Sequence, residues 1–216
     1  GGFYCAKVLE PLGADTAGSR YLDPDGSFPN HIPNPENETA MQSIMDAVQE
    51  SKADLGIIFD TDVDRAGAVL SDGTELNRNR IIAMMAAILL REHPGTTIVT
   101  DSITSTGLAA FIRKHGGVHH RFKRGYRNVI NESMRLNREG HDSQLAMETS
   151  GHGALKENYF LDDGAYLVTR LLIELARAKK EGYTLESLIA DLAEPAESKE
   201  FRMNILVPDF KAYGQK

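Results

Sequence analysis

Short apolar runs alternate along the chain with longer stretches of helical periodicity. The apolar runs predict strands at residues 55–59, 66–73 (with a closing Asp-Gly turn), 96–100, 117–122 and 143–147. The periodic stretches predict helices at residues 3–12, 37–52, 78–92, 106–115, 128–138 and 162–182. Strands that alternate with helices in this way indicate an α/β fold, in which helices cover the faces of sheets.

A change of pattern near residue 76 divides the chain into two units. An Asp-Gly turn at 72–73 closes one strand, and a mostly apolar helix begins shortly afterwards. We therefore expect one domain over residues 1–76 and a second over 77–195, followed by a strand and a tail over 196–216. The opening letters "GGFYCAKVLEPLGA" form a glycine turn that enters a helix with no strand before it. We expect a piece of a longer protein.

The composition is that of an ordinary globular protein, with 41% hydrophobic and 25% charged residues among 216. A net charge of −7 and the lack of a basic block disfavour nucleic acid and anionic membranes as partners. The longest apolar run, residues 81–90, is about half of what a membrane span needs. A single cysteine, Cys5, excludes an intramolecular disulfide and favours a reducing, cytoplasmic location.

The stretch "FDTDVDR" places three aspartates at alternate positions beyond a predicted strand. In this acidic loop, residues 60–65, the carboxylates of Asp60, Asp62 and Asp64 can turn toward a common point if the backbone curls. Hard oxygen ligands without histidine or thiolate neighbours favour Mg²⁺. A solvated acidic turn is the alternative. Arg65 either binds a phosphate that lies beside the metal or pairs with the aspartates.

Two other motifs also place aspartates at alternate positions, as the acidic loop does. An EF-hand that starts at Asp60 needs glycine at its sixth position and glutamate at its twelfth, where Arg65 and Ser71 stand, so an EF-hand is excluded. A phosphatase of the haloacid-dehalogenase type also begins with aspartates two residues apart after a strand. That family prefers threonine or valine where Asp64 stands, so an aspartyl phosphatase with Asp60 as nucleophile is a second hypothesis.

A second loop, residues 148–152, follows the predicted strand at 143–147. Glu148, Ser150 and His152 alternate around small residues, so their hydrogen-bonding groups can face one way. A glutamate beside hydroxyl groups is a common way to hold a sugar, although such a stretch can also be a simple turn. We call it the glutamate loop.

A third loop, "FKRGYR" at residues 122–127, gathers basic residues around a glycine ahead of a predicted helix. Lys123, Arg124 and Arg127 at a helix N-terminus predict an anion site, with a solvated basic loop as the alternative. We call it the basic loop.

The three loops, in this order, resemble those of the α-D-phosphohexomutases, the phosphoglucomutase and phosphomannomutase family. The family pattern Asp-Gly-Asp-x-Asp-Arg matches the acidic loop, with Thr61 in place of glycine. The pattern Gly-Glu-x-Ser-Gly-His matches the glutamate loop, with Met147 in place of the first glycine. The proline-rich segment "DGSFPNHIPNPE" is also similar to the family's segment ahead of the helix that precedes the acidic loop.

The resemblance implies the two middle domains of a four-domain enzyme, each with a small mixed sheet and helices packed on it. With this resemblance we expect all three loops to lie at sheet edges and to face one cleft. Domains II and III would correspond to residues 1–76 and 77–195, and residues 196–216 would begin the connection to a C-terminal domain. No stretch of this sequence matches the family's Thr-Ala-Ser-His-Asn-Pro phosphoserine loop or its Arg-x-Ser-Gly-Thr phosphate loop. The N- and C-terminal domains would therefore be partners from the same protein.

The activity implied is an isomerase that interconverts hexose 1-phosphate and hexose 6-phosphate through a phosphoserine and a 1,6-bisphosphate. Mg²⁺ would bind to the three aspartates, Arg65 would be catalytic, and glucose 1,6-bisphosphate would be the activator. The residues implied to bind the hexose phosphate are Glu148, Ser150, His152, Lys123 and Tyr126. Glucose and mannose are not distinguished, and a non-catalytic sugar-phosphate-binding module is a further alternative. We expect the 216-residue chain to be inactive alone.

Overall fold

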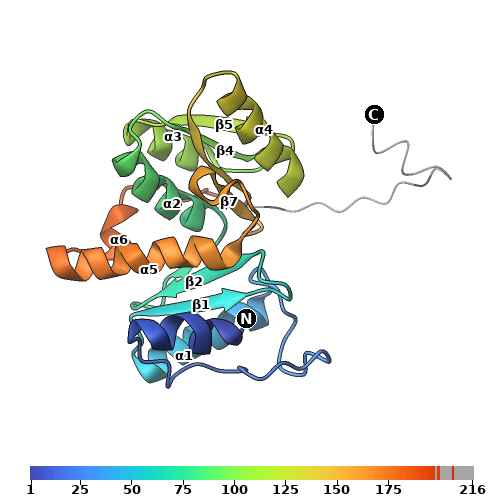
Figure 1. The fold of residues 1–216 in the computed structure, drawn as a ribbon, viewed down its shortest axis with the longest axis vertical. Coiled ribbons are helices and arrows are strands. Elements are labelled where there is room, and N and C mark those ends of the chain that lie inside the picture. Colours follow the sequence, from blue (N-terminus) through green and yellow to red (C-terminus); the bar gives the residue numbers. More distant parts are fainter. Residues whose placement is uncertain (198, 200–205, 207–216) are drawn as a thin grey trace.

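The computed structural model describes residues 1–197, 199 and 206, and its strands form two separate small sheets (Figure 1). The first sheet is antiparallel, in the order β1 (Leu55–Phe59), β2 (Ala66–Leu70) and β3 (Glu75–Leu76). Leu55 pairs with Leu70 and Phe59 pairs with Ala66, so β1 and β2 form a hairpin. The acidic loop is the connection at the end of this hairpin.

The second sheet has the order β5-β4-β6-β7 and is mixed. Strands β4 (Thr97–Asp101), β5 (Val118–Phe122) and β6 (Ser143–Met147) are parallel, and β7 (Gly153–Leu155) runs antiparallel to β6. The glutamate loop joins β6 to β7. The basic loop follows β5, so both loops lie at the carboxyl ends of parallel strands, where α/β sheets usually place their ligands.

Six α-helices of the described part surround these sheets. They are α1 (Glu38–Ser51), α2 (Arg78–Glu92), α3 (Thr106–Lys114), α4 (Tyr126–Arg138), α5 (Gly164–Glu181) and α6 (Leu185–Leu188). Shorter helical turns are Cys5–Leu9, Glu10–Leu12 and Lys156–Asn158. Asn37 caps α1, because its side chain accepts a hydrogen bond of 3.0 Å from the Ala40 amide.

The predicted α/β fold is confirmed, and the expected helices and strands agree with the structure to within about two residues at most ends. The segment at residues 13–19 is a connection without a strand. The sequence did not predict β3, β7 or α6. The strand expected in the tail falls outside the described residues, apart from Leu206, which has no regular structure.

One helix of the second unit packs on the sheet of the first. The β1–β2 hairpin lies between two helices, with α1 on one face and α5 on the other (Figure 1). Ile58 and Val69 pack with α1, whereas Ala66 packs with Val168 of α5. The side chains of a strand alternate between its two faces, so the hairpin has an apolar residue for each helix. The acidic loop is thereby placed against the N-terminal end of α5.

The largest core cluster extends through both units. It is centred on α2, and it includes Leu70 and Leu76 of the first sheet, Leu145 of the second and Leu171 of α5. The two sheets are thus joined by a continuous apolar core. No described helix has the length and apolar character needed to cross a membrane.

Candidate active site

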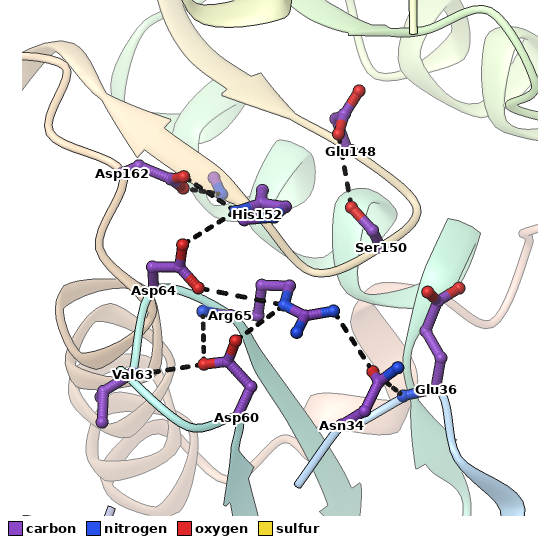
Figure 2. Close-up of polar contacts among 11 residues, drawn as sticks. Asn34, Glu36, Asp60, Val63, Asp64, Arg65, Glu148, Ser150, His152 and Asp162 are labelled. Atoms are coloured by element: carbon purple, nitrogen blue, oxygen red, sulfur yellow. Dashed lines mark hydrogen bonds and ion pairs between the residues drawn. The ribbon is translucent and has the colours of Figure 1, made fainter. Parts of the chain in front are cut away.

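The acidic loop is a compact hairpin connection organised by Asp60. This carboxylate is buried, and its Oδ1 accepts hydrogen bonds from the amides of Val63 (3.0 Å) and Arg65 (3.3 Å). Its Oδ2 accepts a hydrogen bond of 2.8 Å from Arg65 Nε (Figure 2). Val63 has a positive φ of 69°, which reverses the backbone between the second and third aspartates. Asp60 therefore closes the loop on itself.

The three aspartates of this loop converge. One carboxylate oxygen from each of Asp60, Asp62 and Asp64 lies within 4.8 Å of the others. Asp62 is exposed and Asp64 is half-buried, and the Oδ1 atom of Asp64 is buried without a hydrogen-bond partner in the described part of the chain. The only ion-pair contact of Asp64 Oδ1 among the described residues is a long one, 3.9 Å from Arg65 Nε. Three hard oxygen donors, one of them without a hydrogen bond, fit a divalent cation such as Mg²⁺.

The crowding of these carboxylates shifts their proton affinities in opposite directions. Burial, the neighbouring Asp60 and, more weakly, Asp162 raise the pKa of Asp64 to about 6, although His152 opposes the shift. Burial also acts to raise the pKa of Asp60, but the hydrogen bonds and charge of Arg65 outweigh it and hold that pKa below its ordinary value. The loop thus has more negative charge than one arginine neutralises, which a bound cation would balance.

Arg65 is held in place by two acceptors. Its Nε donates to Asp60, and its Nη1 donates to Asn34 Oδ1 at 3.4 Å (Figure 2). Of the two roles considered for Arg65, pairing with an aspartate is observed. The Nη2 atom makes no hydrogen bond to any described residue, so the guanidinium retains a donor for an anionic ligand.

The glutamate loop is also fixed by its own acid. Glu148 is buried, and its Oε1 accepts a hydrogen bond of 2.5 Å from the amide of Gly125 in the basic loop. Its Oε2 accepts from Ser150 Oγ at 3.4 Å. Burial raises the pKa of Glu148, and the Gly125 amide opposes this only in part. Glu148 therefore links the glutamate loop to the basic loop.

His152 joins the two loops of the site. Its backbone forms an antiparallel bridge with Arg65, and its Nδ1 lies 3.5 Å from Asp64 Oδ2 and 2.8 Å from Asp162 Oδ2 (Figure 2). The imidazole also stacks on the ring of Tyr126, with centroids 4.7 Å apart and planes inclined by 18°. Burial lowers the pKa of His152, but Asp162 and Asp64 outweigh that effect and raise it. The acidic and glutamate loops are thus in direct contact.

Only some residues of the basic loop contact the glutamate loop. Gly125 and Tyr126 contact the glutamate loop, as described above, and Arg127 lies over the Tyr126 ring at 5.7 Å. Lys123 is exposed and makes no hydrogen bond or ion pair with any described residue. A role for Lys123 in the site therefore stays a prediction.

The chain matches one family along most of its length. Residues 1–73 match the phosphoglucomutase/phosphomannomutase alpha/beta/alpha domain II, and residues 77–195 match domain III of the same family. The chain belongs to the phosphoglucomutase/phosphomannomutase family. It is 31% identical to a phosphoglucomutase of Neisseria meningitidis serogroup A over 97% of this chain and 43% of the relative. It is 33% identical to a phosphomannomutase/phosphoglucomutase of Pseudomonas syringae over 96% of this chain and 43% of that protein.

A solved structure supports the same assignment. The crystal structure of a phosphoglucomutase/phosphomannomutase family protein from Burkholderia thailandensis is 33% identical and superposes with a TM-score of 0.68. It is matched over 80% of this chain and 36% of that one. The chain spans about two-fifths of the length of the curated relatives named above, at 43%.

Two residues of the candidate site were not found from the sequence. Asp162 pairs with His152, and Asn34 accepts from Arg65. A signal for Asp162 exists in the letters "DDG" at residues 162–164, because only one aspartate can cap the following helix. Asp163 is that cap, accepting from the Tyr166 amide at 2.9 Å. The other aspartate is free to hold a different group.

Proposed function

We propose that this chain provides the metal-binding and sugar-binding loops of a phosphohexomutase that interconverts hexose 1-phosphate and hexose 6-phosphate. The observation that supports the proposal best is the contact between the acidic and glutamate loops. Arg65 and His152 pair through their backbones, and Asp64 lies 3.5 Å from His152. A ligand that touches both loops would present its phosphoryl group to the carboxylate cluster and its hydroxyls to Glu148.

The acidic loop would bind the phosphoryl group. Asp60, Asp62 and Asp64 would hold Mg²⁺, which when bound neutralises and polarises a phosphoryl group. Arg65 would direct a guanidinium N–H at a phosphoryl oxygen as the reaction's charge-stabilising residue. Asp60 and Asn34 orient that guanidinium before any ligand arrives, so its position has little entropy left to lose.

The glutamate loop would bind the sugar. Glu148 and Ser150 present an acceptor and a hydroxyl side by side, which suits two adjacent hydroxyls of a hexose. A pair of adjacent hydroxyls can be read in either orientation of the sugar, as both half-reactions of a mutase require. His152, Tyr126 and Lys123 would contact the same substrate.

The wider reaction scheme is part of the proposal. The phosphoryl donor would be a serine in another domain, a hexose 1,6-bisphosphate would be the intermediate, and glucose 1,6-bisphosphate would be the activator. The N- and C-terminal domains of the relatives would supply what the 216-residue chain does not contain. The proposed domains are residues 1–76 and 77–195, with 196–216 as the start of a connection.

The geometry disfavours an aspartyl phosphatase. Its nucleophile would be Asp60, whose side chain is only 3% exposed. Both of its oxygens already accept hydrogen bonds, from two amides and from Arg65 Nε. A nucleophilic carboxylate needs an accessible oxygen that approaches the phosphorus in line, which the burial of Asp60 and these contacts oppose. Metal binding asks less, because an oxygen that accepts a hydrogen bond keeps a lone pair for a cation. Trapping of an aspartyl-phosphate analogue with beryllium fluoride on Asp60 would reverse this preference.

Ligand binding tests the sugar site directly. In the presence of Mg²⁺, glucose 1-phosphate and glucose 6-phosphate should each shift the amide NMR signals of residues 148–152 and 123–126. Glu148→Gln should weaken this binding about tenfold or more, because a charged acceptor of sugar hydroxyls is lost. Glu181→Gln, an exposed substitution at the end of α5, is the matched control. Shifts confined to other surfaces would contradict the assignment.

Turnover tests the reaction. A dehydrogenase-coupled assay should find no interconversion of glucose 1-phosphate and glucose 6-phosphate by the 216-residue chain, even with Mg²⁺ and glucose 1,6-bisphosphate. A longer protein that contains this chain should catalyse it, and Arg65→Ala there should lower the rate by about 100-fold or more. Turnover by the chain alone would show that the phosphoryl donor has been misplaced.

A further inference from the structure

We propose that segment 162–164 (Asp162, Asp163 and Gly164) positions the acidic loop for metal binding from outside that loop. The segment belongs to the second sheet's part of the chain and immediately precedes α5. The inference rests on the proposed function, which assigns the metal to the acidic loop. The inference gives a positioning role to segment 162–164, which lies outside the sequence patterns of the acidic and glutamate loops.

Gly164 contacts the backbone of the acidic loop so closely that no side chain fits. Its N–H donates a hydrogen bond of 3.1 Å to the carbonyl of Val63. A Cβ at Gly164 would lie 2.8 Å from both the Val63 carbonyl oxygen and the Arg65 carbonyl carbon, and 3.1 Å from the Ala66 nitrogen. All three neighbours are backbone atoms, which cannot rotate away. Glycine is therefore required for this approach.

The residue held by Gly164 has an unfavourable backbone conformation. Val63 lies in the left-handed region at φ 69°, where a β-branched side chain is strongly disfavoured. Two hydrogen bonds hold it there, one from its own N–H to Asp60 and one to its carbonyl from Gly164. Because Val63 lies between two of the three aspartates, its conformation sets the direction of Asp64 relative to Asp62.

The other two residues of the segment fix it to the glutamate loop and to α5. Asp162 Oδ2 holds His152 Nδ1 at 2.8 Å, and Oδ1 accepts from the Gly153 amide at 3.1 Å. Asp163 caps α5 and donates its N–H to the Gly153 carbonyl at 3.1 Å. The segment therefore joins three elements, so the conformation of the acidic loop depends on a contact with the other unit.

This arrangement predicts that metal binding and the Gly164–Val63 hydrogen bond stabilise each other. If the loop presents its three carboxylates only when Val63 is held, then a bound cation must favour the held state by the same factor. Breaking the contact should weaken metal binding without removing any ligand.

The substitution Gly164→Ala tests the proposal in the 216-residue chain. Mg²⁺ affinity measured by calorimetry should fall about tenfold, which corresponds to about 1.4 kcal/mol. The Mn²⁺ electron paramagnetic resonance signal, which reports the ligand geometry, should change as well. Gly26→Ala is the control, because a Cβ there meets no atom within 4 Å. Thermal unfolding identifies any variant that does not fold.

Amide exchange in the unmodified chain tests the same point without a variant. Saturating Mg²⁺ should slow exchange of the Gly164 amide at least fivefold. The Gly182 amide, bonded at 2.8 Å to Ala178 at the other end of α5, should be unaffected. Unchanged exchange at Gly164, or full Mg²⁺ affinity in folded Gly164→Ala, would overturn this inference alone. A wild-type chain that binds no Mg²⁺ would overturn the proposed function together with it.

Discussion

Replacement of Glu174 with glutamine should destabilise the chain by about 2 kcal/mol. Glu174 lies on α5 with 1% of its surface exposed and forms an ion pair with Arg91 of α2. It also accepts a hydrogen bond of 2.6 Å from Tyr183 Oη, and Arg177 lies 3.5 Å away. The carboxylate thus ties α5, which carries the 162–164 segment, to the central helix of the core.

The magnitude follows from what glutamine retains. Glutamine preserves the shape of the side chain and an acceptor for Tyr183, but it removes the charge that Arg91 and Arg177 face. Loss of one partner of a fully buried ion pair costs about 3–5 kcal/mol. Here the side chains of both arginines are more than one-third exposed, so water solvates them after the carboxylate is lost. We therefore estimate the loss of stability from the contribution of a charged hydrogen bond, about 1.5–3 kcal/mol.

Urea and thermal unfolding at neutral pH measure this effect. At about 3 °C per kcal/mol for a chain of this size, Tm should fall by about 6 °C. Glu181→Gln on the same helix is the exposed control and should change Tm by less than about 2 °C. A Glu174→Gln variant as stable as the parent at pH 7 would refute the reasoning.

The pH dependence of the unfolding free energy tests independently whether the Glu174 carboxylate stabilises the fold. Burial acts to raise the pKa of Glu174, but Arg91 and Tyr183 outweigh it and hold that pKa below the ordinary value of 4.5. A depressed folded-state pKa contributes stability above the unfolded value, and that contribution is lost as pH falls through the folded value. The difference in unfolding free energy between the parent and Glu174→Gln should therefore have its full value above pH 4.5 and should shrink as the pH falls below that value.

Three further predictions concern the site and the second sheet. Asp62→Asn should raise the Mg²⁺ dissociation constant in a calorimetric titration, and equal binding would make the loop a simple acidic turn. Asp162→Asn should lower the pKa of His152 measured by NMR, because burial is then opposed by Asp64 alone. Burial and the nearby arginines at 121 and 113 lower the pKa of His119 from 6.5 to about 4. The contribution of His119 to stability is therefore complete above pH 6.5 and decreases as the pH falls to 4. In His119→Gln the unfolding free energy should depend less on pH across that range.

The regular elements were predictable because their signals are local. Strands β1 and β6 coincide with runs of five residues, and α2 coincides with a long apolar stretch between polar ends. By contrast, β3 has two residues, β7 has three and α6 has four, which is too short for any periodicity to show. These elements exist because tertiary packing holds them.

The site was predictable in part for the same reason. Convergence of the three aspartates depends on a six-residue loop, and local spacing indicated it. The role of Arg65 depends on Asn34, 31 residues away, so the sequence left two alternatives open. The partner of His152 is Asp162, and the letters "DDG" do not show which of the two aspartates caps α5 and which holds the histidine. That the loops meet was expected from the family resemblance, not from the spacing of the residues.

Paramagnetic broadening by Mn²⁺ tests the central claim most directly. Mn²⁺ accepts the same oxygen ligands as Mg²⁺ and broadens the NMR signals of nearby nuclei. At substoichiometric Mn²⁺ the account predicts loss of amide signals from residues 60–65 and also from Ser150 and His152, while Gly182 stays sharp. Excess Mg²⁺ should restore them, and Asp62→Asn should weaken the effect. Broadening that leaves residues 150–152 sharp, or that is centred elsewhere, would contradict a shared site of the acidic and glutamate loops.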